Sequence, residues 1–388
     1  MTIHSCWAEI DTQALEDNYR LLRSLAPGAA ECVAVVKADA YGHSLALCGP
    51  AAVRAGARWL AVATMPEAIA ARSASAEARI LAIGGVLPGW GAEAIAHGIT
   101  PSVWTLAQME ELEGAARAAD LGSGAFPVHL EIDTGMSRQG VSLDELPATL
   151  ARFGSQSPLR VEAVMTHLYA SDESDGARSR MQLERLEKAL GIVRSVPEAA
   201  PRLAYLSAGA SAALSGRDAE AVAVLAAKFQ LQPMFRFGLA LYGIAPLSAD
   251  WQLPGRLVPV LTWKTRVESL REISPGAEIG YNGTFVATEP MRLALISAGY
   301  ADGLDRRLGN RFSLLVHDER APIVGRVSMD TAVLDVTGIA GVEAGDEVVI
   351  LGAQGAGTIP AWELAEAAGT IPWEVFTRIG PRVPRVRV

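Results

Sequence analysis

Short runs of apolar residues recur along the chain up to Gly243, and they alternate with alanine-rich segments that favour helix. The runs are largely β-branched and uncharged, as expected for strands that are buried on both faces of a parallel sheet. Counting gives eight of them: "ECVAVV", "WLAVAT", "RILAIGG", "ITPSVW", "PVHLEID", "RVEAVMTH", "RLAYLSAG" and "PMFRFG".

The segments between these runs carry the pattern of covering helices. Residues 105–119 and 177–195, for example, place apolar residues three and four positions apart with charges between them. Eight strand–helix alternations over about 230 residues match the length of a (β/α)8 barrel of the TIM type. A doubly wound sheet is the alternative, because a count of strands does not show closure. We predict the barrel over residues 11–243.

The pattern changes after Gly243, where apolar runs follow one another closely and are separated by Gly, Pro, Asp and Asn. This spacing predicts a mainly β second domain over residues 244–388, to which residues 1–10 contribute a strand. We also expect a helix at about 360–368 and a solvated or interface-bound basic tail, "RVPRVRV".

Composition narrows the class of protein. The 388 residues carry a net charge of -9 without a long basic run, which argues against nucleic-acid binding and favours a small ligand. The three cysteines are too few and too irregularly spaced for a disulfide scaffold or a metal site, and they indicate a reducing compartment. With neither a secretion signal nor an apolar membrane span, we expect a cytoplasmic protein with no membrane partner.

Candidate chemistry gathers where the predicted barrel strands end, which is the catalytic end of such barrels. Lys37 follows the first run in "AVVKADAYGHS", where partly apolar surroundings favour a neutral, nucleophilic amine. Taken alone, Lys37 is more simply a strand-ending lysine that reaches solvent. Later strands and the loops after them add further candidates: Arg138 and Ser211 in loops after the fifth and seventh strands, His167 at the end of the sixth, and Arg236 and Gly238 on the eighth. The small residues of "SAGASAAL" ahead of a helix leave backbone N–H groups free for a phosphate.

Together these motifs resemble the alanine racemase family, the fold-type III enzymes that use pyridoxal 5'-phosphate. The resemblance continues through the second domain in "EIGYNGTF", "SAGYADGLDRRLGN", "VGRVSMD" and "IPWEVFTRIGPRVPR". It therefore covers nearly the whole chain, with six motifs in the family's order.

The resemblance implies a role for each matching residue. Lys37 matches the lysine that binds the cofactor as a Schiff base and serves the D-face proton, and Tyr281 matches the opposite base, which enters from the partner subunit. Racemisation needs two such groups, one on each face of Cα. The implied assembly is a head-to-tail homodimer with two composite sites. Without the family match, Tyr281 is an ordinary turn tyrosine.

The remaining matches surround the cofactor. Arg236 matches the arginine that faces the pyridine nitrogen and, because it stays protonated, weakens the electron sink. His167, which alone is more simply a core histidine, matches the link from that arginine to the catalytic tyrosine. Arg138 matches the arginine near the phenolic oxygen and the substrate, and Met329 matches a partner-subunit residue that binds the substrate carboxylate. The phosphate-binding and pocket-lining positions match Tyr41, Ser211, Gly238, Leu239 and Trp373.

Three positions depart from the family pattern. Glu131 stands where many members carry a carbamylated lysine, and we hypothesise that it pairs directly with Arg138. Trp373 replaces a tyrosine and lacks a hydrogen-bond acceptor. Ala210 replaces a common asparagine before Ser211. The last two leave the exact substrate open.

The sequence thus predicts an isomerase, a pyridoxal-phosphate amino-acid racemase that interconverts L- and D-alanine, either for D-alanine biosynthesis or for catabolism. Racemisation of serine or of a broader set of amino acids is an alternative. A fold-type III decarboxylase is disfavoured because Arg236 stands where those enzymes use a carboxylate. A non-catalytic pyridoxal-phosphate-binding protein is a further alternative.

Overall fold

The protein is described from a computed structural model that covers residues 1–388, apart from 1–4, 172, 174, 197–201, 216 and 246–254. The described residues form two compact units. One contains 13–40 and 48–258, and the other contains the N-terminal residues up to Thr12, a short segment 41–47, and 259–388. Residues 1–4 of the predicted N-terminal strand lie outside the described part of the chain.

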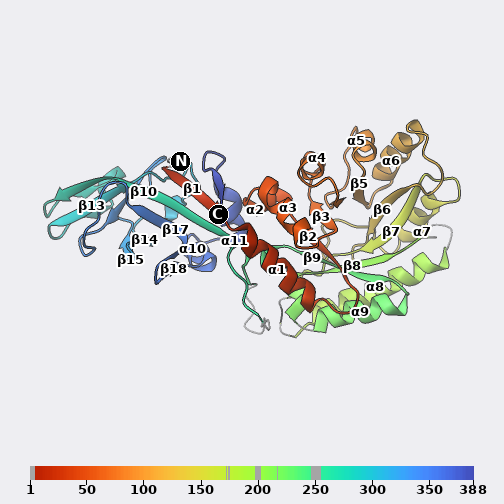
Figure 1. The fold of residues 1–388 in the computed structure, drawn as a ribbon. Helices are drawn as coiled ribbons and strands as arrows, with labels where there is room; N and C mark the ends of the chain where they lie inside the picture. The colour runs from red at the N-terminus through yellow and green to blue at the C-terminus, as the bar shows by residue number, and fades with distance from the viewer. Residues whose placement is uncertain (1–4, 172, 174, 197–201, 216, 246–254) are drawn as a thin grey trace. The chain divides into compact units, whose positions relative to one another are not determined.

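The first unit is a closed parallel barrel of eight strands, so the barrel prediction is confirmed and the doubly wound alternative is wrong (Figure 1). The first and last strands, β2 and β9, close the barrel by pairing in parallel, with Val33 opposite Arg236. The strands are β2 (Glu31–Val35), β3 (Trp59–Val62), β4 (Arg79–Ala82), β5 (Ile99–Val103), β6 (Phe126–Glu131), β7 (Leu159–Met165), β8 (Tyr205–Ala210) and β9 (Gln232–Phe237).

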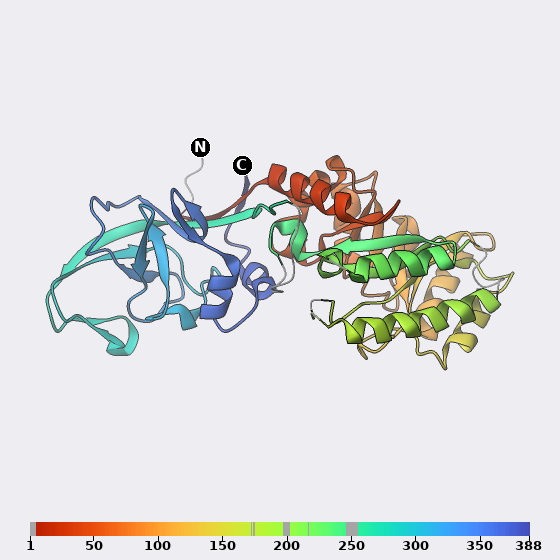
Figure 2. The same cartoon turned by 90° about the horizontal axis from the view of Figure 1, so that it is seen from below.

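Helices surround the barrel strands, as Figures 1 and 2 show from two directions. Their apolar faces pack on the strands, and the predicted helix over 177–195 is α8. The helices are α1 (Thr12–Leu25), α3 (Leu45–Arg54), α4 (Met65–Ala74), α5 (Gly91–Ala96), α6 (Leu106–Ala118), α7 (Leu146–Leu150), α8 (Ala177–Ser195) and α9 (Arg217–Lys228). Short 3-10 turns also belong to this unit: η1 (Ala151–Phe153) follows α7, η2 (Ser211–Ser215) follows β8, and η3 (Leu239–Tyr242) follows β9.

The second unit is built on a mainly antiparallel sheet around the long strand β10 (Leu261–Ile273). β10 pairs with β1 (Cys6–Ile10), β13 (Met291–Ile296) and β17 (Glu347–Gln354). The other strands are β11 (Glu278–Ile279), β12 (Phe285–Val286), β14 (Ser313–Val316), β15 (Glu319–Pro322), β16 (Ala332–Asp335), β18 (Gly357–Ile359) and β19 (Arg385–Arg387). The short helices and turns are η4 (Tyr281–Gly283), η5 (Arg306–Leu308), α10 (Ala361–Ala367) and α11 (Pro372–Arg378).

The basic tail differs from the prediction. It forms β19, which pairs in parallel with β1. Arg385 in this strand donates to the carbonyls of Ile379, Gly380 and Val383, at 2.7 Å each, and to that of Gly42 at 2.9 Å. Its charge therefore satisfies backbone acceptors instead of lying free in solvent.

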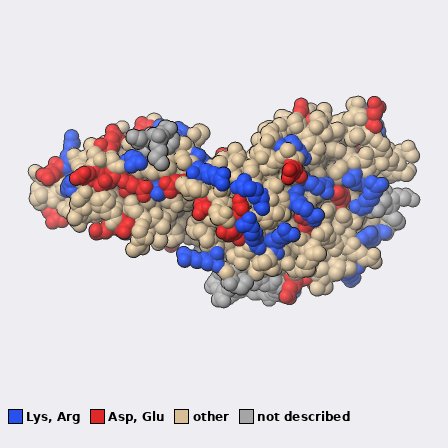
Figure 3. Space-filling model, in the orientation of Figure 1, with Lys and Arg blue, Asp and Glu red and all other residues tan. Residues whose placement is uncertain are grey.

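Charged side chains of opposite sign gather in different places on the face that Figure 3 shows. Figure 3 shows acidic side chains in a band over the strands β10 and β13, and basic side chains gathered over the barrel. None of the described helices is long and apolar enough to cross a bilayer.

Candidate active site

Lys37 lies directly after the barrel strand β2, at the head of a left-handed turn. The four residues that follow it, 38–41, all have positive φ, between +51° and +56°. Each such residue costs about 1–2 kcal/mol, so the surroundings must hold the turn in place. Glu67 does so with one carboxylate, which accepts from the N–H of Ala38 at 2.8 Å and from that of Ala63 at 2.8 Å.

The Lys37 side chain is half-buried, and its surroundings are cationic. Burial is the main cause that lowers the pKa of its amine, and Arg138 and Arg236 lower it further, while Glu67 acts in the opposite direction. An amine in these surroundings loses its proton more readily than a lysine in solvent. Lys37 therefore has the electrostatics of a nucleophile, as the sequence predicted.

Arg236 lies on β9 with only 6% of its surface exposed. Its guanidinium donates to Ser207 Oγ at 2.6 Å, to the carbonyl of Thr166 at 2.8 Å, and to His167 Nδ1 at 3.3 Å. No carboxylate of the described residues lies within 4.0 Å of it. Burial lowers the pKa of Arg236 to about 10, and the charge of Glu131 partly offsets this effect. The guanidinium is still protonated at neutral pH.

His167 follows β7 and is neutral. Burial, together with the charges of Arg236 and Arg138, lowers the pKa of the imidazole to about 3. Because Arg236 only donates, His167 Nδ1 accepts, and this assigns the ring proton to Nε2. Gln182, fully buried on α8, fixes the backbone of His167 by donating to its carbonyl at 2.9 Å.

The loops after β8 and β9 are joined through Ser211. The N–H of Gly238 donates to Ser211 Oγ at 2.9 Å, which leaves the hydroxyl proton of Ser211 free to point elsewhere. Gly209 fits here only as glycine, because an added Cβ would lie 2.4 Å from the ring of Phe235. Leu239 is buried behind the loop at 3% exposure. Strand pairing sets Ala210 opposite Arg236.

Arg138 lies on the loop that follows β6, and its side chain is exposed. The direct Glu131–Arg138 ion pair that we hypothesised is absent from the part of the chain that the structure describes. Glu131, only 4% exposed, instead accepts from Gln139 Nε2 at 2.7 Å. The carboxylate of Glu131 thus binds the residue that follows Arg138 in the loop and makes no ion pair with Arg138 itself.

Tyr281 lies on a tight turn of the second unit, and 67% of its surface is exposed. Three residues of the turn have positive φ: Gly280 at +72°, Asn282 at +64° and Gly283 at +51°. At Gly283 the positive φ disfavours any residue with a side chain, and an added Cβ would also displace the Glu278 side chain, whose carboxylate would lie 2.5 Å away. Asn310 ties the turn down by donating to the carbonyl of Thr284 at 3.2 Å.

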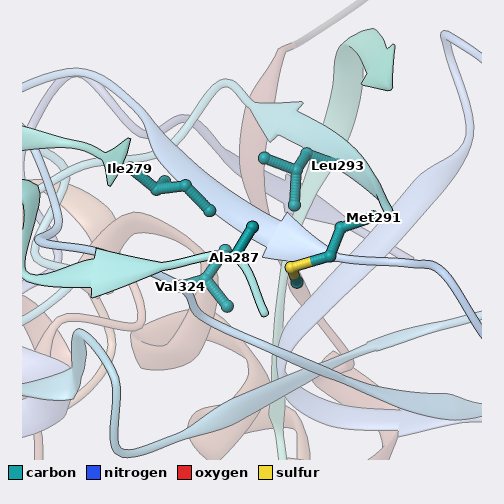
Figure 4. Close-up of a cluster of buried hydrophobic side chains, with 5 residues drawn as sticks. All are labelled: Ile279, Ala287, Met291, Leu293 and Val324. Atoms are coloured by element: carbon teal, nitrogen blue, oxygen red, sulfur yellow. The ribbon is translucent and has the colours of Figure 1, made fainter. Parts of the chain in front are cut away.

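Below this turn lies a small hydrophobic cluster (Figure 4). Its buried members are Ile279, Ala287, Met291, Leu293 and Val324. The half-buried Phe285 packs against them from the other arm of the turn. The cluster thus gives the exposed tyrosine a rigid base.

The remaining predicted residues of the second unit are Met329, Trp373 and Tyr41. Met329 is 53% exposed, and its carbonyl accepts from the N–H of Ala301 at 2.9 Å. Trp373 is half-buried on α11 and packs edge-on against Trp362 with ring centroids 5.9 Å apart. Tyr41 is buried, which raises the pKa of its phenol to about 12.

Family comparisons account for nearly the whole chain. Residues 10–246 match the profile described as "Alanine racemase, N-terminal domain", and residues 260–387 match "Alanine racemase, C-terminal domain". The chain belongs to the alanine racemase family.

Curated alanine racemases and solved alanine racemase structures resemble the chain along its whole length. The alanine racemase of Syntrophobacter fumaroxidans is 38% identical over 375 residues, which cover 96% of this chain and 95% of that protein. That of Sorangium cellulosum is 37% identical over 394 residues, covering 97% of each. The structure from Streptomyces lavendulae superposes with a TM-score of 0.88 at 33% identity, covering 100% of this chain and 98% of that one.

Two further alanine racemase structures carry bound molecules. The enzyme from Bacillus anthracis with bound L-Ala-P has a TM-score of 0.89 at 30% identity, covering 100% of this chain and 96% of that one. The enzyme from Bartonella henselae has covalently bound pyridoxal phosphate, a TM-score of 0.84 and 27% identity, and the match covers 100% of both chains.

Sequence reasoning missed the supporting residues of this alanine racemase fold. Glu67, Gln139, Gln182 and Asn310 act through backbone groups or through another side chain. For Glu67 a signal exists, since Thr64 and Glu67 form a capping box at the start of α4. The other three follow no local pattern.

Proposed function

We propose that this protein is a pyridoxal-phosphate-dependent alanine racemase that interconverts L-alanine and D-alanine. The observation that carries the proposal is the buried Arg236, a cation without a carboxylate partner among the described residues. It lies on the strand that pairs with β2, the strand that Lys37 follows. A permanently protonated donor in this place distinguishes a racemase from a decarboxylase, which needs a carboxylate there.

The residues at the barrel end fit pyridoxal phosphate in their chemistry. Lys37 offers an amine that deprotonates readily, Arg236 offers a buried donor, and Ser211 offers a hydroxyl proton beside the Gly238 backbone. Cationic groups outnumber the one buried carboxylate, Glu131, that acts on them. Such a site favours an anionic ligand with a carbonyl group, an acceptor nitrogen and a phosphate.

In this proposal the cofactor, when bound, supplies an electron-withdrawing ring that acidifies the Cα–H bond of the amino acid joined to it. Arg236 donates a hydrogen bond to the ring nitrogen and keeps its own proton. A weaker electron sink results, which limits side reactions such as transamination. Ser211, Gly238, Leu239 and Tyr41 hold the phosphate, and Trp373 lines the pocket.

Two groups of the protein move the proton at Cα. Lys37 Nζ serves the face from which the proton of D-alanine leaves, and Tyr281 Oη of the partner subunit serves the L face. The neutral His167 links Arg236 to that tyrosine. Arg138 and the partner subunit's Met329 position the substrate carboxylate.

We further propose that two copies assemble head to tail. Tyr281 and Met329 are 67% and 53% exposed. Tyr300, in the motif "SAGYADG", is 44% exposed. Large exposed side chains on rigid loops are typical of a surface that a second subunit covers. The three cysteines are all buried, and this supports a reducing, cytoplasmic location.

The proposal is tested by incubating the purified, cofactor-loaded protein with each L-amino acid and separating the enantiomers of the product. We expect D-alanine to form fastest, with serine and larger amino acids well behind. Release of carbon dioxide from basic amino acids would instead identify a decarboxylase. Cofactor binding without turnover of any amino acid would identify a binding protein.

A further inference from the structure

The loop that carries Arg138 is fixed on both sides of this residue. On the N-terminal side, Asp133 Oδ1 accepts from the N–H of Gly135 at 2.8 Å and from that of Ser137 at 3.1 Å. On the C-terminal side, the side chain of Gln139 donates to Glu131 Oε2 at 2.7 Å and to the carbonyl of Ile83 at 3.2 Å. Arg138 thus stands between two anchors.

The guanidinium of Arg138 itself makes no hydrogen bond or ion pair with any residue that the structure describes. The side chain of an exposed arginine of this kind samples many rotamers, and the position of its backbone sets the region that these rotamers reach. Backbone anchoring therefore sets where the charge can reach, while all five N–H donors remain available to an anionic ligand.

Glu131 is an unusual anchor. It is 4% exposed at the end of β6, yet no cation lies within 4.0 Å of it among the described residues. Burial raises the pKa of its carboxyl, while the hydrogen bond from Gln139 and the charges of Arg236 and Arg138 lower it. Gln139 is the one described side chain that donates to this carboxylate, and it also donates to the carbonyl of Ile83, which follows β4; in the barrel, β5 lies between β4 and β6.

We infer that Gln139 is a positioning residue for substrate and cofactor binding, which acts by joining the loop of Arg138 to the buried carboxylate of Glu131. Glu131 and Gln139 together replace a direct ion pair between Glu131 and Arg138. It supplies a fixed negative charge to the site and holds Arg138 in place, while the guanidinium stays free for the ligand. This inference rests on the proposed function, in which Arg138 contacts the bound anion.

The test compares four variants of the full-length protein: Gln139→Leu, Gln139→Glu, the exchanged double variant Glu131→Gln/Gln139→Glu, and Gln13→Leu. The last is a matched control, since Gln13 donates to Asp17 Oδ1 at 3.0 Å on the exposed surface of α1. For each, the dissociation constant of pyridoxal phosphate from the apoenzyme and the KM and kcat for L-alanine are measured.

We expect Gln139→Leu to raise both the dissociation constant and KM about tenfold or more, as for loss of a hydrogen bond to a charged group, with a smaller change in kcat. Gln139→Glu places two carboxylates together and costs at least as much. The exchanged variant restores an amide–carboxylate pair, so both constants return towards those of the wild type. Gln13→Leu leaves them unchanged.

Two results would overturn the inference. Gln139→Leu could match Gln13→Leu in both constants, or the exchanged variant could bind no better than Gln139→Glu. Failure of the proposed function is distinguishable from either, because the wild-type protein would then bind no cofactor or racemise no alanine.

Discussion

At the scale of single residues, the protonation of His167 depends on its burial next to Arg236. Burial is the main cause that lowers the pKa of the imidazole from its ordinary 6.5 to about 3, and the charges of Arg236 and Arg138 lower it further. Between these two pH values, His167 is therefore neutral in the folded protein and protonated in the unfolded chain. Neutral His167 is compatible with passing a hydrogen bond towards a tyrosine, and a protonated imidazole next to Arg236 is not.

This depressed pKa predicts how stability depends on pH. Between pH 6.5 and about 3 the unfolded chain binds the extra proton, so stability falls as the pH falls through that window. The loss amounts to about 1.4 kcal/mol per pH unit for one such histidine. The buried His129 has a lowered pKa for the same main reason and adds to this slope.

His167→Gln keeps an acceptor for Arg236 but does not titrate. The stability of this variant should therefore fall less steeply than that of the wild type as the pH falls. The measurement is the urea midpoint at pH 6.5 and at pH 5, compared between the variant and the wild type. His97→Gln, at a surface position 36% exposed, is the control. Equal acid slopes for the wild type and His167→Gln would contradict the assignment.

At the scale of elements, the turn that carries Tyr281 depends on the cluster beneath it. Ile279, at the end of β11 and 6% exposed, is the cluster residue closest in sequence to the tyrosine. Replacing Ile279 with alanine leaves a cavity, and the short hairpin of β11 and β12 is too small to rearrange and fill it.

Ile279→Ala should cost roughly 2–5 kcal/mol of stability. Thermal melting followed by circular dichroism measures this loss. Leu87→Ala is the matched control, because Leu87 is 70% exposed and its truncation removes no packing. A melting temperature for Ile279→Ala equal to that of Leu87→Ala would show that the cluster does not support the turn.

Elements with a long periodic pattern were predictable from the sequence. The buried runs gave the barrel strands, and residues 177–195 are the helix α8. The left-handed turn after Lys37 was not predictable, because "ADAY" reads as ordinary helix and the Glu67 carboxylate that accepts from the N–H of Ala38 lies in another element, α4. The tail strand β19 was missed because its pairing partner, β1, lies at the other end of the chain.

The same distinction applies to the site. Residues that we propose to contact the ligand directly, such as Lys37 and Arg236, stand in motifs that are visible in the sequence. Gln139 and Gln182 act through other residues, and their positions follow from the folding of distant strands onto one another. The direct Glu131–Arg138 pair was predicted from the opposite charges of the two groups, although glutamate is shorter than a carbamylated lysine; in the structure Glu131 accepts from Gln139 instead.

At the scale of the whole molecule, the account requires two copies of the chain for each active site. Lys37 and Tyr281 belong to different compact units. In the proposed head-to-tail dimer, each site takes the lysine from one copy and the tyrosine from the other. A variant that lacks either group is then inactive alone.

Mixing two such inactive variants tests this arrangement. Lys37→Ala and Tyr281→Phe, dissociated and reassembled together, should form mixed dimers in which one of the two sites has both native groups. Random pairing restores about a quarter of the wild-type sites. Enantiomer analysis of alanine after reassembly measures the recovery. No recovery, despite mixed dimers detected by native mass spectrometry, would place both groups in one copy.

The central claim, racemisation through two groups on opposite faces of Cα, is tested most directly by deuterium incorporation. The cofactor-loaded protein is incubated with L-alanine in deuterated water, and the Cα deuterium content of each enantiomer is followed from the earliest times. The account predicts D-alanine that carries deuterium at Cα, while the remaining L-alanine stays largely protonated early on. Alanine that gains no deuterium in either enantiomer would contradict it.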